Sequence, residues 1–202
     1  NTISTKYIDR ENSIDDIIEA IESLATKGGN YIIFFPSYAY LKMVHEKMGE
    51  TEFECIVQSQ NLSEDDKDEI INKFKTTTNT KFGFFVMGGI FSEGIDFIGE
   101  ALSGVIIVGV GLPLVCDENN ILKEYFEEKY PSRGFEYAYV YPGFTKVIQS
   151  VGRVIRNETD KGVAILMDTR FTHPLYRKLM PPHWKNIIVI SNNYQLKKEL
   201  KK

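Results

Sequence analysis

The chain has 202 residues, of which 43% are hydrophobic and 26% are charged, a composition typical of one globular domain with a full apolar core. Its net charge of −4 excludes a broad polybasic surface, so any contact with nucleic acid must be local or shared with a partner. The only cysteines, Cys55 and Cys116, cannot form a four-cysteine zinc or iron–sulfur site, and we expect free, buried thiols in a reducing compartment. No apolar run reaches the roughly 18 residues of a membrane span, and from the start at Asn1 we expect a fragment or a processed chain.

In the first half of the chain, amphipathic helices alternate with short apolar strands. Ser13, Ser37 and Ser63 are typical helix N-caps, because a serine hydroxyl can accept a bond from a free N–H of the first turn. The helices predicted after these caps cover residues 14–24, 38–48 and 64–74. The strands predicted between them cover residues 31–35, 53–57 and 81–87.

The second half continues the alternation. The strands predicted here are residues 104–110, 137–141, 162–167 and 187–190. We expect helices over residues 122–130 and 149–156, and a polar tail over residues 191–202. Near-continuous apolar strands separated by amphipathic helices predict an α/β fold, with a mainly parallel sheet covered by helices on both faces. In such sheets ligands bind in the loops after the strands, which here are residues 36–38, 87–97, 109–117 and 168–173.

The most informative segment is residues 149–156, Gln-Ser-Val-Gly-Arg-Val-Ile-Arg. On a helix, Gln149, Arg153 and Arg156 share one stripe, opposite an apolar face. The two guanidinium groups repel each other unless an anion lies between them, so they are typical of half of a phosphate clamp. A solvated helix face is the alternative. Gly152, in the predicted middle of this helix, indicates that a ligand or another backbone comes close.

A glycine-rich loop follows the predicted strand 81–87. Gly88, Gly89 and Gly94 allow a backbone to approach a phosphate closely, and Glu93 and Asp96 add carboxylates. A simple tight turn is the alternative explanation. The chain has no G-x-x-x-x-G-K-[ST] phosphate-binding loop and no carboxylate run after a strand that would hold the Mg²⁺ of a nucleotide. The residues therefore suggest arginines that complete a site built elsewhere.

A third motif is residues 34–38, Phe-Phe-Pro-Ser-Tyr. Ser37 either only caps its helix or binds a nucleic-acid phosphate together with the free N–H groups of that helix. Tyr38 or Tyr40 could stack on a base.

With these motifs in this order, the chain resembles the second RecA-like motor domain of a superfamily 2 helicase, and more closely the XPD/DinG family of 5′→3′ DNA helicases. The matching segments, motif IV, motif V, motif VI and a following Asp-x-Arg-Phe, are residues 34–38, 92–97, 149–156 and 168–171, and the late segment 182–184 also fits. The resemblance covers residues 12–184 and implies a RecA-like three-layer sandwich that forms one domain over residues 1–202.

The resemblance also implies the ligands and partners. ATP with Mg²⁺ would bind between this domain and a first motor domain of the same polypeptide, and single-stranded DNA would be the substrate, in the cytoplasm or the nucleus. An iron–sulfur cluster would belong to the parent protein and not to this chain. We expect the isolated chain to be inactive.

The roles implied for single residues follow the motifs. Arg153 and Arg156 would reach the γ-phosphate, and Gln149 would help to bind it. The residues implied beside the nucleotide are Glu93, Gly94 and Asp96. The residues implied to face single-stranded DNA are Ser37, Tyr38, Gly88 and Gly89. We expect both arginines to be accessible to solvent and to be held by Asp96, Glu93 or Asp168 in the absence of phosphate.

One departure from the family pattern concerns motif V. Many relatives have Ala-Arg-Gly-Lys before Ser-Glu-Gly, whereas this chain has Met87-Gly-Gly-Ile90, without either cation. Phosphate contacts there would have to come from backbone N–H groups.

Two other classes of function remain open from the residues. The chain could be a non-enzymatic module that binds nucleic acid or protein, or a self-sufficient small-molecule enzyme. Against the second, His45, His173 and His183 form no recognisable acid–base set with the glycine-rich loop.

Overall fold

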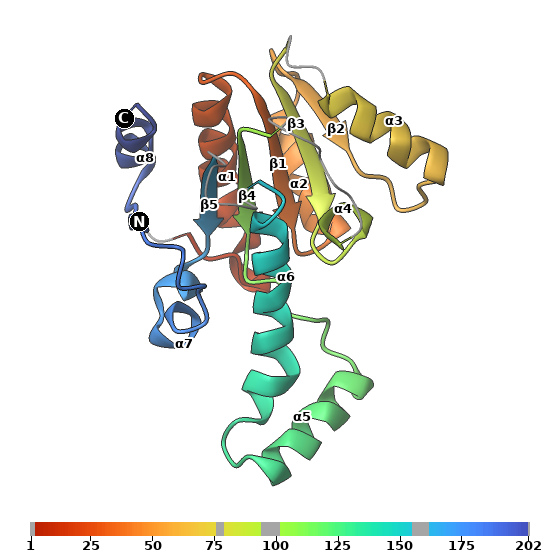
Figure 1. Cartoon of the computed structure of the whole chain (residues 1–202), viewed down its shortest axis with the longest axis vertical. Coiled ribbons are helices and arrows are strands. Elements are labelled where there is room, and N and C mark those ends of the chain that lie inside the picture. The colour runs from red at the N-terminus through yellow and green to blue at the C-terminus, as the bar shows by residue number, and fades with distance from the viewer. Residues whose placement is uncertain (1–2, 76–78, 94–101, 155–161, 202) are drawn as a thin grey trace.

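The computed structural model describes residues 3–75, 79–93, 102–154 and 162–201. Over these residues the chain forms a parallel five-stranded sheet with the strand order β2-β3-β1-β4-β5 (Figure 1). The strands are β1 (Asn30–Phe35), β2 (Glu54–Val57), β3 (Lys81–Val86), β4 (Gly104–Val108) and β5 (Val163–Met167). Five of the seven predicted strands are confirmed in this sheet.

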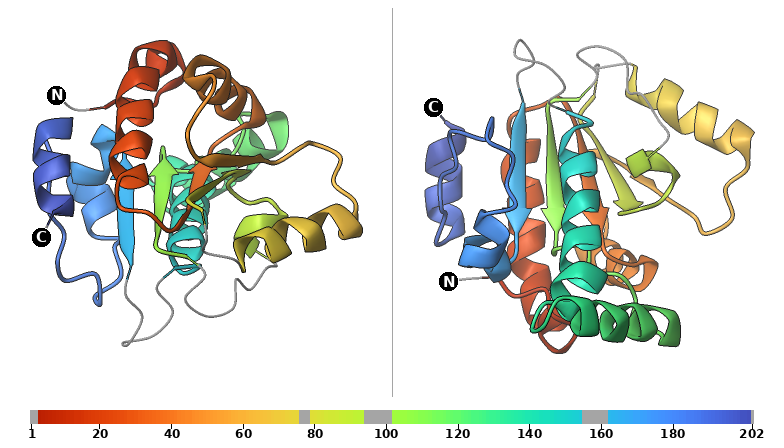
Figure 2. Two further views of the ribbon diagram at one scale, coloured as in Figure 1. Left: turned by 90° about the horizontal axis from the view of Figure 1, so that it is seen from above. Right: turned by 60° about the horizontal axis from the view of Figure 1, so that its bottom comes forward.

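Helices cover both faces of the sheet, as the apolar strands predict (Figure 2). One face packs against α1 (Arg10–Ala25) and α2 (Tyr38–Met48), and the other packs against α3 (Glu64–Phe74), α4 (Ile90–Glu93) and α6 (Tyr141–Val151). Alternate strand residues supply the two cores: Phe34 and Phe85 pack on the α6 side, and Phe35 and Phe84 on the α1 side. The predicted three-layer α/β RecA-like fold is therefore confirmed.

Beyond the carboxyl ends of the strands, α5 (Asp117–Lys129) extends away from the sheet (Figure 1). A short π-helix, η2 (Glu136–Val140), returns the chain to α6. Aromatic rings join this excursion, because Tyr137 stacks on Phe126 at a centroid distance of 5.1 Å and on Tyr130 at 4.9 Å. The remaining short elements are η1 (Tyr7–Asp9), η3 (Thr169–Thr172) and α7 (Pro174–Arg177).

Two predicted strands are wrong. Residues 137–141 are helical, since η2 runs directly into α6. Residues 187–190 form no strand, and Ile188 and Val189 are 57% and 53% exposed. A short apolar run fits a buried strand, a buried helix turn or an exposed loop, and its periodicity cannot distinguish among them.

The predicted polar tail forms a docked helix, α8 (Asn193–Leu200). The side chain of Asn192 caps this helix by accepting a bond from the Gln195 N–H, and Leu196 is buried in the core on the α1 side. Lys197 pairs with Glu19 of α1 at 3.2 Å. Because α8 has its own apolar contact, residues 193–200 pack on the α1 side and do not extend into solvent. The thiols of Cys55 and Cys116 are free as expected, but both are partly exposed rather than buried.

Candidate functional site

The axis of the candidate site is α6, which crosses one face of the sheet from the carboxyl ends of the strands to their amino ends. At its first turn, Gly143 lies against the loop after β4, because a Cβ atom on Gly111 would be 2.7 Å from the Gly143 carbonyl oxygen. Just beyond its last turn, Val154 lies beside the start of β5, where a Cβ atom on Gly162 would be 2.4 Å from Val154 Cγ1. The two ends of α6 therefore lie at two different edges of the sheet, the first at the carboxyl ends of the strands and the last at their amino ends.

The helix expected over residues 149–156 ends earlier than the sequence predicts. Its last residue is Val151, with Gly152 as the C-cap, and Arg153 and Val154 lie in turns. Gly152 caps the end of α6 with φ −62°, which is not the left-handed conformation common for glycine at this position. The prediction that Gly152 lies in the middle of the helix is therefore wrong. Gln149 is exposed on the last helical turn. The stripe predicted for Gln149 and Arg153 is thus interrupted by the end of the helix.

Arg153 joins this end of α6 to the glycine-rich loop. Its Nε donates to the main-chain carbonyl oxygen of Ser92 at 3.0 Å, and its side chain is partly exposed. Ser92 is fully buried, and its hydroxyl donates to the Gly89 carbonyl oxygen at 2.9 Å. Glu93 is the last residue of α4, directly after Ser92. The structure therefore brings Arg153, from segment 149–156, to the glycine-rich loop. Gly94, Asp96 and Arg156 lie outside the described residues.

At the carboxyl edge, a buried glutamine that the sequence did not single out connects two motifs. Gln58, only 5% exposed, donates from Nε2 to the Tyr38 hydroxyl at 2.9 Å and accepts from the Val86 N–H at Oε1, also at 2.9 Å. Tyr38 is half-buried, and burial raises the pKa of its phenol. This bridge fixes the start of α2 relative to the end of β3. Segment 34–38 and the glycine-rich loop therefore form one surface.

Ser37 and the two neighbouring tyrosines have different environments. The Ser37 hydroxyl accepts a bond from the Tyr40 N–H at 3.3 Å, so Ser37 is the N-cap of α2 as predicted. Tyr40 is fully buried, bonds to Ser13 and lies under the Arg10 guanidinium, whose Cζ is 5.0 Å from the ring centroid. The prediction that Tyr40 could stack on a base is therefore wrong. Of the two tyrosines, only Tyr38 reaches the surface.

The glycine turn after β3 is closed by its own backbone. Gly88 has φ +72°, a left-handed conformation that favours glycine. The Gly89 N–H donates to the Val86 carbonyl oxygen at 3.2 Å. Because that N–H already has an acceptor, it is not available to a phosphate as the sequence suggested. A Cβ atom on Gly89 would lie 3.1 Å from the same oxygen, so the turn is tightly packed.

Asp168 has a structural partner set of its own. The carboxylate accepts bonds from Arg170 Nε at 2.7 Å and from the Thr5 N–H at 3.0 Å, and its side chain is fully buried. Burial alone would raise the pKa of Asp168, but hydrogen bonds from Arg170 and Thr5, with the charge of Arg170, lower it below the ordinary value. Asp168 therefore ties the N-terminal segment and Arg170 to the end of β5, and the expectation that it holds Arg153 is wrong.

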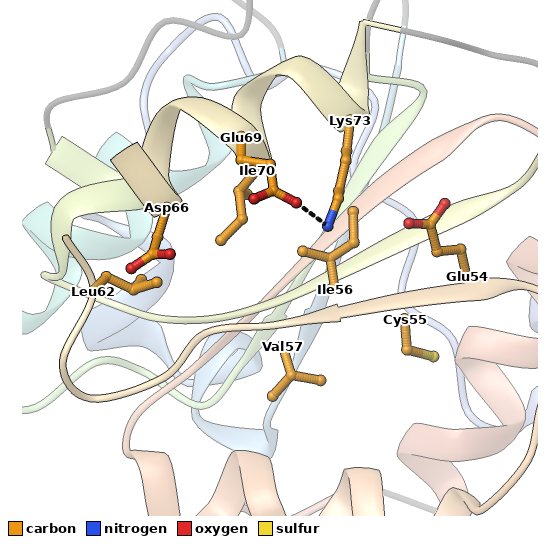
Figure 3. Close-up of a pocket in the computed structure, with 9 residues that line it drawn as sticks. All are labelled: Glu54, Cys55, Ile56, Val57, Leu62, Asp66, Glu69, Ile70 and Lys73. Carbon is orange, nitrogen blue, oxygen red and sulfur yellow. Dashed lines mark ion pairs between the residues drawn. The ribbon is translucent and has the colours of Figure 1, made fainter. Parts of the chain in front are cut away.

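A shallow cavity of about 300 Å³ lies elsewhere, between the edge strand β2 and α3 (Figure 3). Lys73 and Glu69 form an ion pair of 2.9 Å at its wall, and Asp66 belongs to the capping box of α3. None of the site residues predicted from the sequence lines it. The charged side chains that α3 contributes to it are thus accounted for by the ion pair and the capping box of that helix.

Other site types receive no support from the described part of the chain. There, no group of three or more His, Cys, Asp or Glu residues could hold a metal ion, and no helix is long and apolar enough to cross a membrane. His45 packs edge-on against Phe84 at a centroid distance of 5.5 Å, and His173 caps α7. We therefore assign no magnesium ligand and no acid–base histidine to the described residues.

Comparisons with known proteins agree with this arrangement. The family described as the helicase C-terminal domain matches residues 20–187. A probable ATP-dependent helicase of Methanocaldococcus jannaschii is 29% identical over 178 residues, which are 81% of this chain and 26% of that protein. The ATP-dependent DNA helicase chl1 of Schizosaccharomyces pombe is 29% identical over 204 residues, which cover 90% of this chain and 24% of that protein.

Solved structures show the same fold. An XPD helicase structure overlaps 87% of this chain and 32% of its own chain, with a TM-score of 0.72 and 24% identity. A structure of apo XPD overlaps 87% of this chain and 36% of its own, with a TM-score of 0.71 and 25% identity. The chain spans about a quarter of the length of the curated relatives quoted above.

Proposed function

This chain belongs to the XPD/DinG family of superfamily 2 helicases as a helicase C-terminal domain, and we propose that it is the second motor domain of an ATP-dependent 5′→3′ DNA helicase. It would form one side of an ATP site, whose other side comes from a first motor domain of the same polypeptide. It would also form one wall of a groove for single-stranded DNA. The parent protein would work inside the cell, in the cytoplasm or the nucleus.

The contact from Arg153 to Ser92 is the observation that carries the ATP side of this proposal. It holds a permanently charged side chain against the end of the glycine-rich motif, with Gln149 exposed one turn away. A guanidinium at the edge of a domain suits the charge that develops on a transferring phosphoryl group. We assign Arg153 and Arg156 to the γ-phosphate, Gln149 to its binding, and Glu93, Gly94 and Asp96 to the nucleotide across the cleft.

The carboxyl edge of the sheet supports the DNA side. Ser37 and Tyr38 lie at the start of α2, and Gln58 links that start to the turn that contains Gly88 and Gly89. A half-buried tyrosine next to a helix N-terminus offers a stacking surface and N–H donors for a nucleic-acid strand. Because α6 separates this edge from Arg153, ATP and DNA would contact different ends of one helix, and cleft closure at one end would move the other.

The test is ATP turnover by the full-length polypeptide that contains this chain. Arg153→Ala and Arg156→Ala should each keep the fold and lower turnover about 10³–10⁵-fold, the range found for arginine fingers. Circular dichroism and thermal unfolding serve as controls for folding. Near-normal turnover in both variants would contradict the assignment of the two arginines to the γ-phosphate.

The isolated 202-residue chain provides a second comparison. We expect no ATP turnover from it, because the phosphate cradle and metal ligands would come from the first motor domain. Tight, ATP-independent binding of single-stranded DNA by this chain alone would favour a non-enzymatic module instead.

A further inference from the structure

A lysine on α6 lies across the glycine turn after β3. A Cβ atom on Gly88 would be 3.1 Å from Cε and 3.2 Å from Cδ and Nζ of Lys146. Lys146 is partly exposed and stands near the carboxyl edge, two turns before Arg153. The end of its side chain therefore lies in close contact with the backbone at Gly88, where a Cβ atom would be crowded.

This placement puts a cation where motif V has none. The run from Met87 to Ile90 contains no charged residue, and the Gly89 N–H already donates to Val86. The Gly89 N–H is therefore not available to a phosphate at this turn. An ammonium with three rotatable donors on a flexible stem is a common phosphate ligand.

The surroundings of this ammonium are held in place by the fold. Gly88 is in a left-handed conformation, and Val86, two residues earlier, is bonded to the buried Gln58, which also bonds Tyr38. Gln58 thus ties the turn that Lys146 contacts to Tyr38 and the start of α2, whereas Arg153, two turns later on the chain, binds Ser92. A phosphate bound by Lys146 would lie on the DNA side of α6.

We propose that Lys146 is a backbone-phosphate contact for single-stranded DNA and supplies from α6 the positive charge that motif V lacks in this chain. The proposal rests on the DNA groove of the proposed function and adds a residue to it. The requirement for glycine at position 88 follows from its φ of +72°, and a Cβ atom there would in addition crowd the end of the Lys146 side chain.

The test is the salt dependence of oligo-thymidine binding by the full-length polypeptide. For single strands, the slope of log K against log salt is negative, and it becomes less negative by about 0.7 for each phosphate contact that is lost. Lys146→Met keeps an unbranched side chain over Gly88 and removes the charge, so its slope should be less negative than the wild-type slope by about 0.7. Lys146→Arg keeps the charge and should retain the wild-type slope.

Lys198→Met is the matched control, because Lys198 is an exposed lysine on α8, which packs beside α1 and contains no residue assigned to DNA. It should retain the wild-type slope. An unchanged slope in Lys146→Met, or an equal loss in Lys198→Met or Lys146→Arg, would overturn the assignment. A raised ATP dissociation constant in Lys146→Met with an unchanged DNA slope would assign the ammonium to nucleotide, and would also overturn it. Wild-type protein that does not bind the oligonucleotide would instead refute the proposed DNA groove itself.

Discussion

At the carboxyl edge of the sheet, polar side chains are buried and bonded within the chain, since Gln58 bridges Tyr38 and Val86, and Asp168 bridges Thr5 and Arg170. At the far end of α6, the side chains of Gln149 and Arg153 reach the surface. Gln149 is exposed, and Arg153 is partly exposed with its Nε on a main-chain carbonyl oxygen. The same helix thus joins an edge where buried polar groups are bonded within the fold to an end where Gln149 and Arg153 reach the surface.

This contrast separates two kinds of contribution. A buried polar group that loses its partner costs free energy in the folded state, so variants at the carboxyl edge should change stability. An exposed side chain contributes little to stability, so variants at the far end of α6 should change turnover and leave the fold intact. Measurements of unfolding can therefore test the contrast without any assumption about DNA or ATP.

The largest effect is expected at Asp168. Asp168→Ala leaves the Arg170 guanidinium, whose side chain is 23% exposed, without its carboxylate. Removal of one partner of a buried ion pair typically lowers the free energy of unfolding by about 3–5 kcal/mol. Denaturant unfolding of the purified chain measures this loss.

The control for Asp168 is Asp15→Ala, because the Asp15 side chain is 78% exposed in its pair with Lys47. An exposed pair is worth at most about 1 kcal/mol. Equal losses in the two variants would contradict the burial argument for the carboxyl edge.

Gln58 should give the next largest effect. Gln58→Leu keeps a side chain of similar volume but removes the acceptor of the Val86 N–H and the donor to Tyr38. The lost bonds should lower the free energy of unfolding by about 1–3 kcal/mol. Gln60→Leu, a change of the same type at an exposed position in the same loop, should have little effect. A neutral Gln58→Leu would show that the bridge does not hold the two loops together.

The pH dependence of stability sharpens the role of Asp168. Its pKa is lowered in the folded chain, so its contribution is fully present above its unfolded pKa of about 3.9 and is lost as the pH falls further, through the folded pKa. One such group changes the free energy of unfolding by at most about 1.4 kcal/mol per pH unit. Since other carboxylates also titrate there, the difference between wild type and Asp168→Asn isolates this one. If the free energy of unfolding of wild type and of Asp168→Asn changed in parallel below pH about 4, the lowered pKa of Asp168 would be contradicted.

The strands of the sheet could be predicted because each is an apolar run bounded by turn residues. The run at 137–141 has the same composition, but it packs against α5 and continues a helix, a choice that depends on contacts from outside the segment. The helix carrying motif VI was predicted too long, because apolar periodicity continues past Gly152 in the sequence while the hydrogen-bonded helix ends at Val151.

Of the site, the sequence identified the residues with recognisable motifs and missed those that act through the fold. Gln58 lies in a polar stretch after β2, and nothing in its neighbours distinguishes it from the exposed Gln60. Only the pairing of β2 with β3 brings it to Val86 and Tyr38. Lys146 was missed for a similar reason, since its proximity to Gly88 depends on how α6 crosses the sheet.

The smallest effects are expected for two adjacent residues at the far end of α6. The Ser150 hydroxyl is fully buried and has no hydrogen-bond partner among the described residues, so Ser150→Ala should raise the free energy of unfolding by about 1 kcal/mol. Gln149→Ala, on the exposed side of the same turn, should change it by less than about 0.5 kcal/mol. Paired denaturant curves measure both variants. A clear loss of stability in Gln149→Ala would mean that an exposed side chain at the far end of α6 contributes as much to stability as a buried one, and the contrast between the two edges would then fail.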